Sequence, residues 1–248
     1  MDAPLIDLDV VLSNAEAEMI RCTRNIPSSH GAPHALRVAS FAKEIAGKEG
    51  INVYLARFVG PFHDLRYFDE EERVVRKLNI SSSQTGMKDI SQILKEFTER
   101  FGWPEVGARE EILFAIQNHN KLPSTEEQAP PLLRILRDAD RLSRLGKLGL
   151  LSILEANRLY GVPFYNVGET ISWSFSTPLI ANEDIKSAIT DVRACLSWWQ
   201  IFETRTGRLQ FLELFGANTS FLTQFADFPI LDNYACWIRW ALDFQENE

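Results

Sequence analysis

Cysteine is scarce in this chain of 248 residues, and the three that occur lie far apart. Cys22, Cys195 and Cys236 form no CxxC pair, and their number is odd. A sparse set of this kind supports neither a disulfide framework nor a structural zinc site built from cysteines. We therefore expect buried, unreactive thiols.

Positive charge is also in short supply. The 26 lysines and arginines are outnumbered by 34 acidic residues, and the formal net charge is -8. Binding along the phosphate backbone of a polynucleotide requires a basic surface, so this balance argues against a nucleic acid polymer as partner. It still allows a small phosphorylated molecule held by a few local cations.

Long apolar runs are absent as well. No run approaches the roughly 18 residues needed to span a bilayer, so no membrane partner is expected. The stretch MDAPLIDLDV at the start is acidic and lacks the basic and apolar regions of a signal peptide. We therefore predict a cytoplasmic location.

Helical periodicity, in contrast, dominates the sequence. Apolar residues recur at helical spacing over Asp9–Thr23, Ala35–Ala46, 52–66, Ile90–Phe101, Val106–Asn118, Leu132–Leu159, Ile185–Thr204, Leu209–Phe225 and the aromatic-rich stretch 233–244. The polar stretch 79–89 is predicted to be a loop, and 162–179 looks extended or irregular. The pattern predicts an all-α protein with a core domain over residues 1–160. A helical C-terminal extension over residues 161–248 is expected to pack on that core.

Polar side chains stand at several core-facing positions of these patterns. His34, His63, His119 and Asp140 each share a helix face with apolar residues, and Asp64 adjoins His63. A single inward histidine is more often a core residue with a hydrogen-bond partner than a metal ligand. Burying such groups separately would cost on the order of several kcal/mol unless each found a partner, whereas one shared cation satisfies them together. Imidazole nitrogens and carboxylate oxygens form a mixed set suited to Mn²⁺, Fe²⁺, Co²⁺, Ni²⁺ or Zn²⁺.

The order and surroundings of these residues resemble the H…HD…D pattern of the HD-domain superfamily of metal-dependent phosphohydrolases. His34 lies in PHALRV, which matches the family's HxxRV start, and RDADRLSRLG around Asp140 is similar to the family's DADRL…G element. The resemblance covers roughly residues 28–150. It implies an HD-domain helical bundle in which His34, His63, Asp64 and Asp140 hold one divalent metal, one of the ions above or Mg²⁺. Asp138 would then support the site or cap a helix.

The sequence also departs from parts of this family. Tyr67 and Phe68 stand where members that hydrolyse guanosine alarmones carry Glu-Asp, so an acid that some members use to activate water is lacking. No GYP motif follows, which argues against the branch that acts on cyclic dinucleotides. Members with two metals use additional histidines, so the resemblance implies a single metal unless His119 is a ligand.

Candidates for the remaining chemistry lie near the motifs. Asp64 would bind the metal and orient its water, and His119 would contact the substrate or donate a proton to the leaving group. Asn120, next to His119, is a candidate for substrate binding. The arginines near the motifs are candidates for holding a phosphate: Arg37, which is also a candidate catalytic residue, Arg66 and Arg141. The competing interpretation makes these arginines surface residues and His119 a core histidine.

Functional hypotheses of different classes follow. The first is a metal-dependent phosphohydrolase that acts on a small phosphorylated substrate, with nucleotides as one candidate class. The second is a ligand-binding or regulatory module that keeps the HD fold and the metal but has lost turnover. A third, an all-α scaffold with incidental histidines, predicts no bound metal. The tryptophans of the C-terminal region are predicted to lie in the core or at a contact between copies of the chain: Trp198, Trp199, Trp237 and Trp240.

Overall fold

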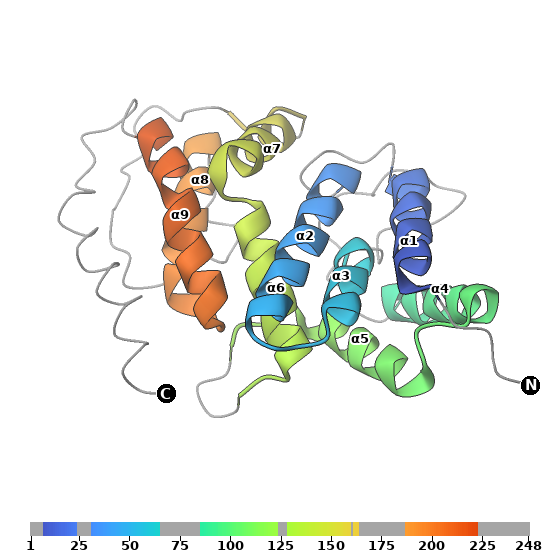
Figure 1. Cartoon of the computed structure of the whole chain (residues 1–248). Helices are drawn as coiled ribbons and strands as arrows, with labels where there is room; N and C mark the ends of the chain where they lie inside the picture. Colours follow the sequence, from blue (N-terminus) through green and yellow to red (C-terminus); the bar gives the residue numbers. More distant parts are fainter. Residues whose placement is uncertain are drawn as a thin grey trace, which may run out of the picture.

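The computed structural model describes residues 7–23, 31–64, 85–123, 128–159, 161–163 and 187–222. Within these ranges the regular structure is entirely helical, which confirms the predicted all-α class. The helices, shown in Figure 1, are α1 (Leu8–Thr23), α2 (Ala32–Lys48), α3 (Val53–Phe62), α4 (Thr85–Phe101), α5 (Val106–Asn118), α6 (Pro131–Ser143), α7 (Gly146–Leu159), α8 (Ala188–Ser197), the 3₁₀ helix η3 (Trp198–Ile201) and α9 (Arg205–Leu222). Among the described residues, no helix is both long and apolar enough to cross a membrane.

Local sequence signals fix where two of the central helices begin. The side chain of Asn52 accepts hydrogen bonds from the backbone N–H groups of Tyr54 and Leu55, which have no partner inside α3. Helix α2 carries Pro33 in its first turn, where the missing N–H is not needed. His34 therefore lies at the very start of α2, and its position along the helix is set by the helix start.

The core is built around α2, α3 and α6, and α2 packs on both of the others. In Figure 1, α6 runs through the middle of the molecule, with α2 and α3 on one side, α8 and α9 on the other, and α7 at the top. The buried apolar side chains of the central helices include Val38, Ala42, Ile45, Phe58, Val59, Phe62, Leu133, Leu136 and Leu142. Helix α6 also contacts α5, α7 and α9, so it is shared between both halves.

Helices α2 and α3 meet in backbone contact at Gly60. A Cβ atom added there would lie 2.5 Å from the backbone N and Cα of Ala39, which is closer than real atoms approach. Only glycine therefore permits this crossing distance. Because His63 follows Gly60 by about one helical turn, the crossing sets how close the end of α3 comes to the start of α2.

The described structure differs from the predicted elements in two places. The stretch Leu132–Leu159 was predicted as one helix, but α6 ends at Ser143 and α7 begins at Gly146, whose φ of 69° is left-handed. Apolar spacing continues across this break, so periodicity alone does not reveal it. In addition, α4 begins at Thr85, inside the predicted loop 79–89. Several predictions lie outside the described residues: Arg66, the stretches 164–179 and 233–244, Trp237 and Trp240.

The C-terminal helices are anchored on α6 by a buried acid. Both carboxylate oxygens of Asp138 accept hydrogen bonds from the backbone N–H of Glu203, and Oδ2 also accepts from the N–H and hydroxyl of Thr204. The hydroxyl of Thr204 accepts in turn from the N–H of Gly207, so it caps α9. Asp138 thus fixes the entry into α9, while the predicted domain boundary at residue 160 stays a prediction.

Candidate metal centre

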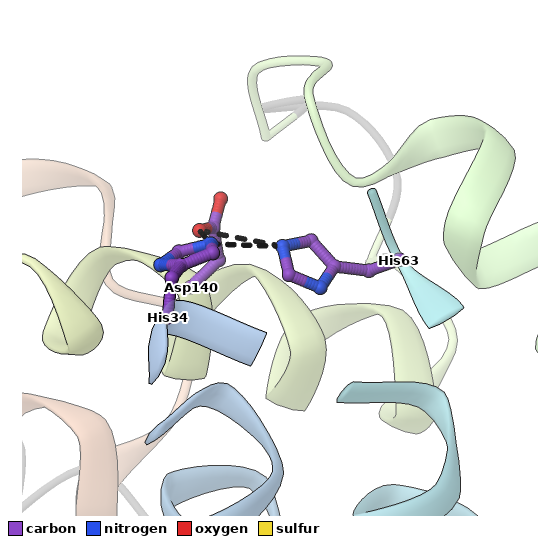
Figure 2. Close-up of side chains that lie close together, drawn as sticks. All are labelled: His34, His63 and Asp140. Atoms are coloured by element: carbon purple, nitrogen blue, oxygen red, sulfur yellow. Dashed lines mark hydrogen bonds and ion pairs between the residues drawn. The ribbon is translucent and has the colours of Figure 1, made fainter. Parts of the chain in front are cut away.

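Four polar side chains converge where the start of α2, the end of α3 and the last turns of α6 meet. Nε2 of His34 lies 3.1 Å from Nε2 of His63 and 3.3 Å from Oδ1 of Asp140. Oδ2 of Asp64 lies 3.2 Å from Nε2 of His63 and 3.6 Å from Nε2 of His34. Both imidazoles are completely buried. Figure 2 shows His34, His63 and Asp140 pointing toward one another from three separate elements.

The other ring nitrogen of His63 is held by the backbone. Nδ1–H of His63 donates a hydrogen bond to the carbonyl oxygen of Gly60 over 2.6 Å. A neutral imidazole carries a single proton, so this bond leaves Nε2 with a lone pair that faces the cluster. Gly60 therefore acts twice: it permits the close helix crossing and it orients His63.

Ser143 determines which ring nitrogen of His34 carries the proton. Its hydroxyl donates its only hydrogen to the carbonyl oxygen of Asp140 over 2.6 Å, since a carbonyl can only accept. The contact of 2.9 Å between Ser143 Oγ and His34 Nδ1 is then a bond in which Nδ1–H donates. Nε2 of His34 is left with a lone pair that faces the lone pair of His63. No sequence motif predicts this role of Ser143, because the contact joins residues 109 positions apart.

His119 repeats the arrangement of His63 on a different helix. It follows the last residue of α5, as His63 follows that of α3, and its Nδ1–H donates to the carbonyl of Ile116 over 2.6 Å. Its Nε2 lies 3.8 Å from Oδ1 of Asp64. His63, Asp64 and His119 form a second group of atoms close enough together to hold a cation, beside the group of His34, His63 and Asp140.

The electrostatics of the cluster favour a positive charge at its centre. Burial works to lower the pKa of His63, but the charge of Asp64, a hydrogen bond to it and the charge of Asp140 raise that pKa to about 9. Burial works to raise the pKa of Asp140, yet its contact with His34 and the positive charge that His63 and His34 carry when protonated hold that pKa well below its usual range. Without a metal, the site draws in a proton to separate the facing lone pairs.

The donor set fits a divalent metal. Two ligand atoms about 2.1 Å from one ion lie about 3.0 Å apart at right angles and about 3.4 Å apart at tetrahedral angles. The measured separations of His34 Nε2 from His63 Nε2 and Asp140 Oδ1 are 3.1 and 3.3 Å. Oδ1 of Asp140 is buried and accepts no hydrogen bond from the described residues, so it too lacks the partner that a cation would supply.

Three of the predicted substrate-binding residues, Arg37, Arg141 and Asn120, lie in the described part of the chain. The guanidinium of Arg37 donates from Nε to the carbonyl of Ser143 and from an NH2 group to the hydroxyl of Ser152, so it braces α2 against α6 and α7. Arg141 is buried, and its NH1 group contacts Asp138, Glu203 and the carbonyl of Ile201. Asn120 is exposed beside His119. These contacts commit Arg141 to the anchor of the C-terminal helices, and a role in substrate binding stays a prediction for it.

Comparison with known families identifies the class of this chain. Residues 31–145 match the family model of the HD domain, and this range contains all four predicted metal ligands. This segment of the chain is therefore an HD domain. A comparison with curated proteins gives no match.

Solved structures with the same fold extend the likeness beyond that segment. YpgQ of Bacillus subtilis, solved in complex with ADP, is 16% identical with a TM-score of 0.63, over 91% of this chain and 98% of that one. The Lin1889 protein of Listeria innocua is 17% identical with a TM-score of 0.61, over 88% and 95% of the two chains. An HD-superfamily hydrolase of Bacillus thuringiensis is 19% identical with a TM-score of 0.59, over 88% and 96%. At these identities the likeness establishes the fold over most of the chain.

Proposed function

We propose that this protein is a metal-dependent phosphohydrolase that acts on a small phosphorylated molecule, with nucleotides the first class to test. One observation carries the proposal: buried imidazole Nε2 atoms and carboxylate oxygens from separate helices converge within 3.1–3.8 Å of one another. His34, His63, Asp64 and Asp140 would hold one divalent metal, and its charge would lower the pKa of a bound water and stabilise charge on a phosphoryl oxygen. The HD-domain family and the ADP complex of YpgQ support the choice of substrate class.

The remaining residues of the site position and move protons. Asp64 is only partly buried, and each of its oxygens faces a different histidine, which suits a carboxylate that orients water at the mouth of the cluster. Nδ1 of His119 keeps its proton on the carbonyl of Ile116, so protons enter and leave this imidazole at Nε2. Nε2 faces the cluster and is the atom that would protonate the leaving group.

The test is metal content followed by turnover. Elemental analysis of the untagged protein is expected to find about one transition metal per chain, because the donor set resembles a mononuclear site. Nucleoside mono-, di- and triphosphates and simple phosphate esters are then offered with Mn²⁺, Co²⁺, Ni²⁺ or Mg²⁺, and phosphate release is measured. Hydrolysis that Asp64→Ala abolishes would support the proposal. A wild-type protein that binds no metal even after reconstitution would overturn it.

The alternative from the sequence is a binding module without turnover, and the same experiment separates it. Tyr67 and Phe68, which motivate that alternative, lie outside the described residues. Metal retention with tight nucleotide binding, and no phosphate release in any of the combinations above, would favour the binding module. Contact between copies of the chain through the tryptophan-rich C-terminal region stays a separate proposal, testable by light scattering.

A further inference from the structure

A phosphoryl substrate beside the metal cluster needs cations, and the two predicted arginines that the structure describes, Arg37 and Arg141, already have partners in the fold. Arg37 donates to two neutral oxygens of its own fold, and Arg141 is paired with acids on the far side of α6. Another arginine, Arg144, interacts through its charge with two of the predicted metal ligands, Asp140 and Asp64, which the sequence motifs did not reveal.

Arg144 stands directly after the last residue of α6 and continues its helical geometry, with φ of −93° and ψ of −1°. It follows Asp140 by four residues, and side chains at this spacing are neighbours on one helix face. The carboxylate of Asp140 points into the cluster (Figure 2), so Arg144 lies one turn further along the same face. The guanidinium lies over the ring of Trp198, with its central carbon 5.9 Å from the ring centroid. The indole face attracts this cation without using its N–H groups.

The charge of Arg144 has no dedicated partner in the part of the chain that the structure describes. None of its guanidinium N–H groups donates a hydrogen bond to a described residue, and no described carboxylate lies within ion-pair distance of the guanidinium. Burial works to lower its pKa, but surrounding negative charges raise it, Asp140 most and Asp191 and Asp64 less. Asp191 is engaged elsewhere, since its Oδ2 accepts from Asn157.

Metal binding would change the balance around Arg144. A divalent ion neutralises the two carboxylates of Asp64 and Asp140, and those are acids that otherwise offset the guanidinium. Arg37 adds a second positive charge nearby. Burial lowers the pKa of Arg37 most, and the charge of Arg144 lowers it further, which indicates that the two guanidinium groups lie near each other. A loaded site therefore carries excess positive charge next to the metal, which is the environment that an anion requires.

We infer that Arg144, held in place by Trp198, binds the phosphoryl oxygens of the substrate at the metal centre. The inference rests on the proposed function and deepens it by assigning the residue that holds the substrate. The planar guanidinium suits bidentate binding of a phosphate, and the Trp198 face restricts the orientations that it adopts.

The test measures binding of inorganic phosphate to the Mn²⁺-loaded protein by isothermal titration calorimetry at constant ionic strength. Arg144→Gln removes the charge, and its phosphate affinity is expected to be roughly tenfold to a hundredfold weaker than that of the wild type. Manganese content, measured by elemental analysis, is expected to stay unchanged. The matched control is Arg100→Gln on α4, because Arg100 also lies over an aromatic ring, that of Phe101 at 4.9 Å, and it is exposed away from the motif residues.

The outcomes separate this inference from the proposed function. Phosphate affinity of Arg144→Gln within about twofold of the wild type overturns the inference and leaves the metal site standing, since that is far less than a charge-assisted bond contributes. An equal loss in Arg100→Gln also overturns it, because the effect would then be general surface charge. A wild type that takes up no Mn²⁺ overturns the proposed function, and the inference with it.

A second pair of variants applies if Arg144→Gln does not fold. Arg144→Lys keeps the charge but loses the planar fork, and Trp198→Leu removes the ring beneath it. Both are expected to bind phosphate several-fold more weakly than the wild type, as both disturb the guanidinium without removing a metal ligand. Wild-type affinity in both variants overturns the inference.

Discussion

Two aspartates of helix α6, only two positions apart, illustrate two kinds of buried polar cluster. Asp138 is completely buried, and its oxygens accept from the N–H groups of Glu203 and Thr204, the hydroxyl of Thr204 and the guanidinium of Arg141. Asp140 is partly exposed, and its Oδ1 faces imidazole nitrogens with no hydrogen-bond donor among the described residues. The hydrogen-bond acceptors of Asp138 are satisfied by the protein, whereas Oδ1 of Asp140 has no donor among the described residues and is available to a cation.

The two clusters also differ in their balance of charge. Around Asp138, two acids and two arginines balance one another: Asp138, Glu203, Arg137 and Arg141. Around Asp140, two acids face histidines that are charged only when they take up a proton, so the ligand set contains no permanent cation. A buried polar cluster that is complete in itself stabilises the fold, whereas one that lacks a divalent charge is built to bind it.

Asp140→Asn should break the second cluster with the largest effect. The amide is a poor metal ligand, and even groups that only orient ligands contribute roughly tenfold to a hundredfold to metal affinity. We expect affinity for Mn²⁺ to fall by more than about a hundredfold, with hydrolysis lost in parallel. Elemental analysis measures the first effect, and thermal unfolding in EDTA should show an intact fold. A variant that retains stoichiometric metal would contradict the assignment of Asp140.

Asp138→Asn should break the first cluster and spare the second. Loss of the carboxylate charge leaves the buried guanidinium of Arg141 short of a partner, and removing one member of a buried pair costs about 3–5 kcal/mol. Urea unfolding of the metal-free protein is expected to show that loss in the free energy of unfolding. Metal content of the folded variant should match the wild type. If the variant instead lost metal at unchanged stability, the contrast between the two aspartates would be wrong.

Gly60→Ala should disturb the geometry that positions His63. The added methyl group meets the backbone of Ala39 at 2.5 Å, and backbone cannot move aside as a flexible side chain can. We expect a loss of about 3 kcal/mol in the free energy of unfolding, at the upper end for overpacking, together with weaker metal binding. Gly47→Ala on α2 is the control, because its methyl group would find an ordinary contact 3.7 Å from Val53. Equal stability of the two variants, measured by urea unfolding, would rule out the tight crossing.

Ser143→Ala should have the smallest effect and sharpen the account of His34. Without the hydroxyl, Nδ1–H of His34 loses its acceptor, so the ring no longer presents Nε2 alone to the metal. Metal affinity is expected to fall roughly tenfold to a hundredfold, measured by competition with a coloured chelator. Long-range ¹H–¹⁵N spectra of the metal-free protein report the tautomer directly. Ser152→Ala removes a contact of Arg37 but none of His34, and it should leave both readouts unchanged.

The sequence was sufficient for the fold class and for the residues that meet at the cluster. Helical periodicity predicted all-α structure, and the H…HD…D order pointed to His34, His63, Asp64 and Asp140, which do lie together. Their role as ligands is a proposal that bound metal will test. The pattern could be recognised because each predicted ligand lies in a short, characteristic sequence motif.

What the sequence did not reveal depends on contacts between distant positions. Arg37 and Arg141 looked suited to phosphate from their spacing, but the acceptors that engage them come from other helices and from the segment before α9. Ser143 and Arg144 belong to the same short motif as Asp140, but the motif does not predict their roles. Only the folded chain shows that Ser143 contacts His34 and that Arg144 lies over Trp198. Proximity in sequence does not specify the partner of a long polar side chain.

The contacts of Asp138 show that the segment matched by the family model is smaller than the structural unit to which it belongs. The family match ends at residue 145, yet the acid that neutralises Arg137 and Arg141 is Glu203, which lies far beyond it. A fragment limited to the matched residues would leave two arginines with one aspartate, and Asp138 would lose the donors of Glu203 and Thr204 and keep only that of Arg141. The matched HD-domain segment is therefore not complete by itself in this chain, because the residues that lead into α9 supply the acid and the hydrogen-bond donors of its buried cluster.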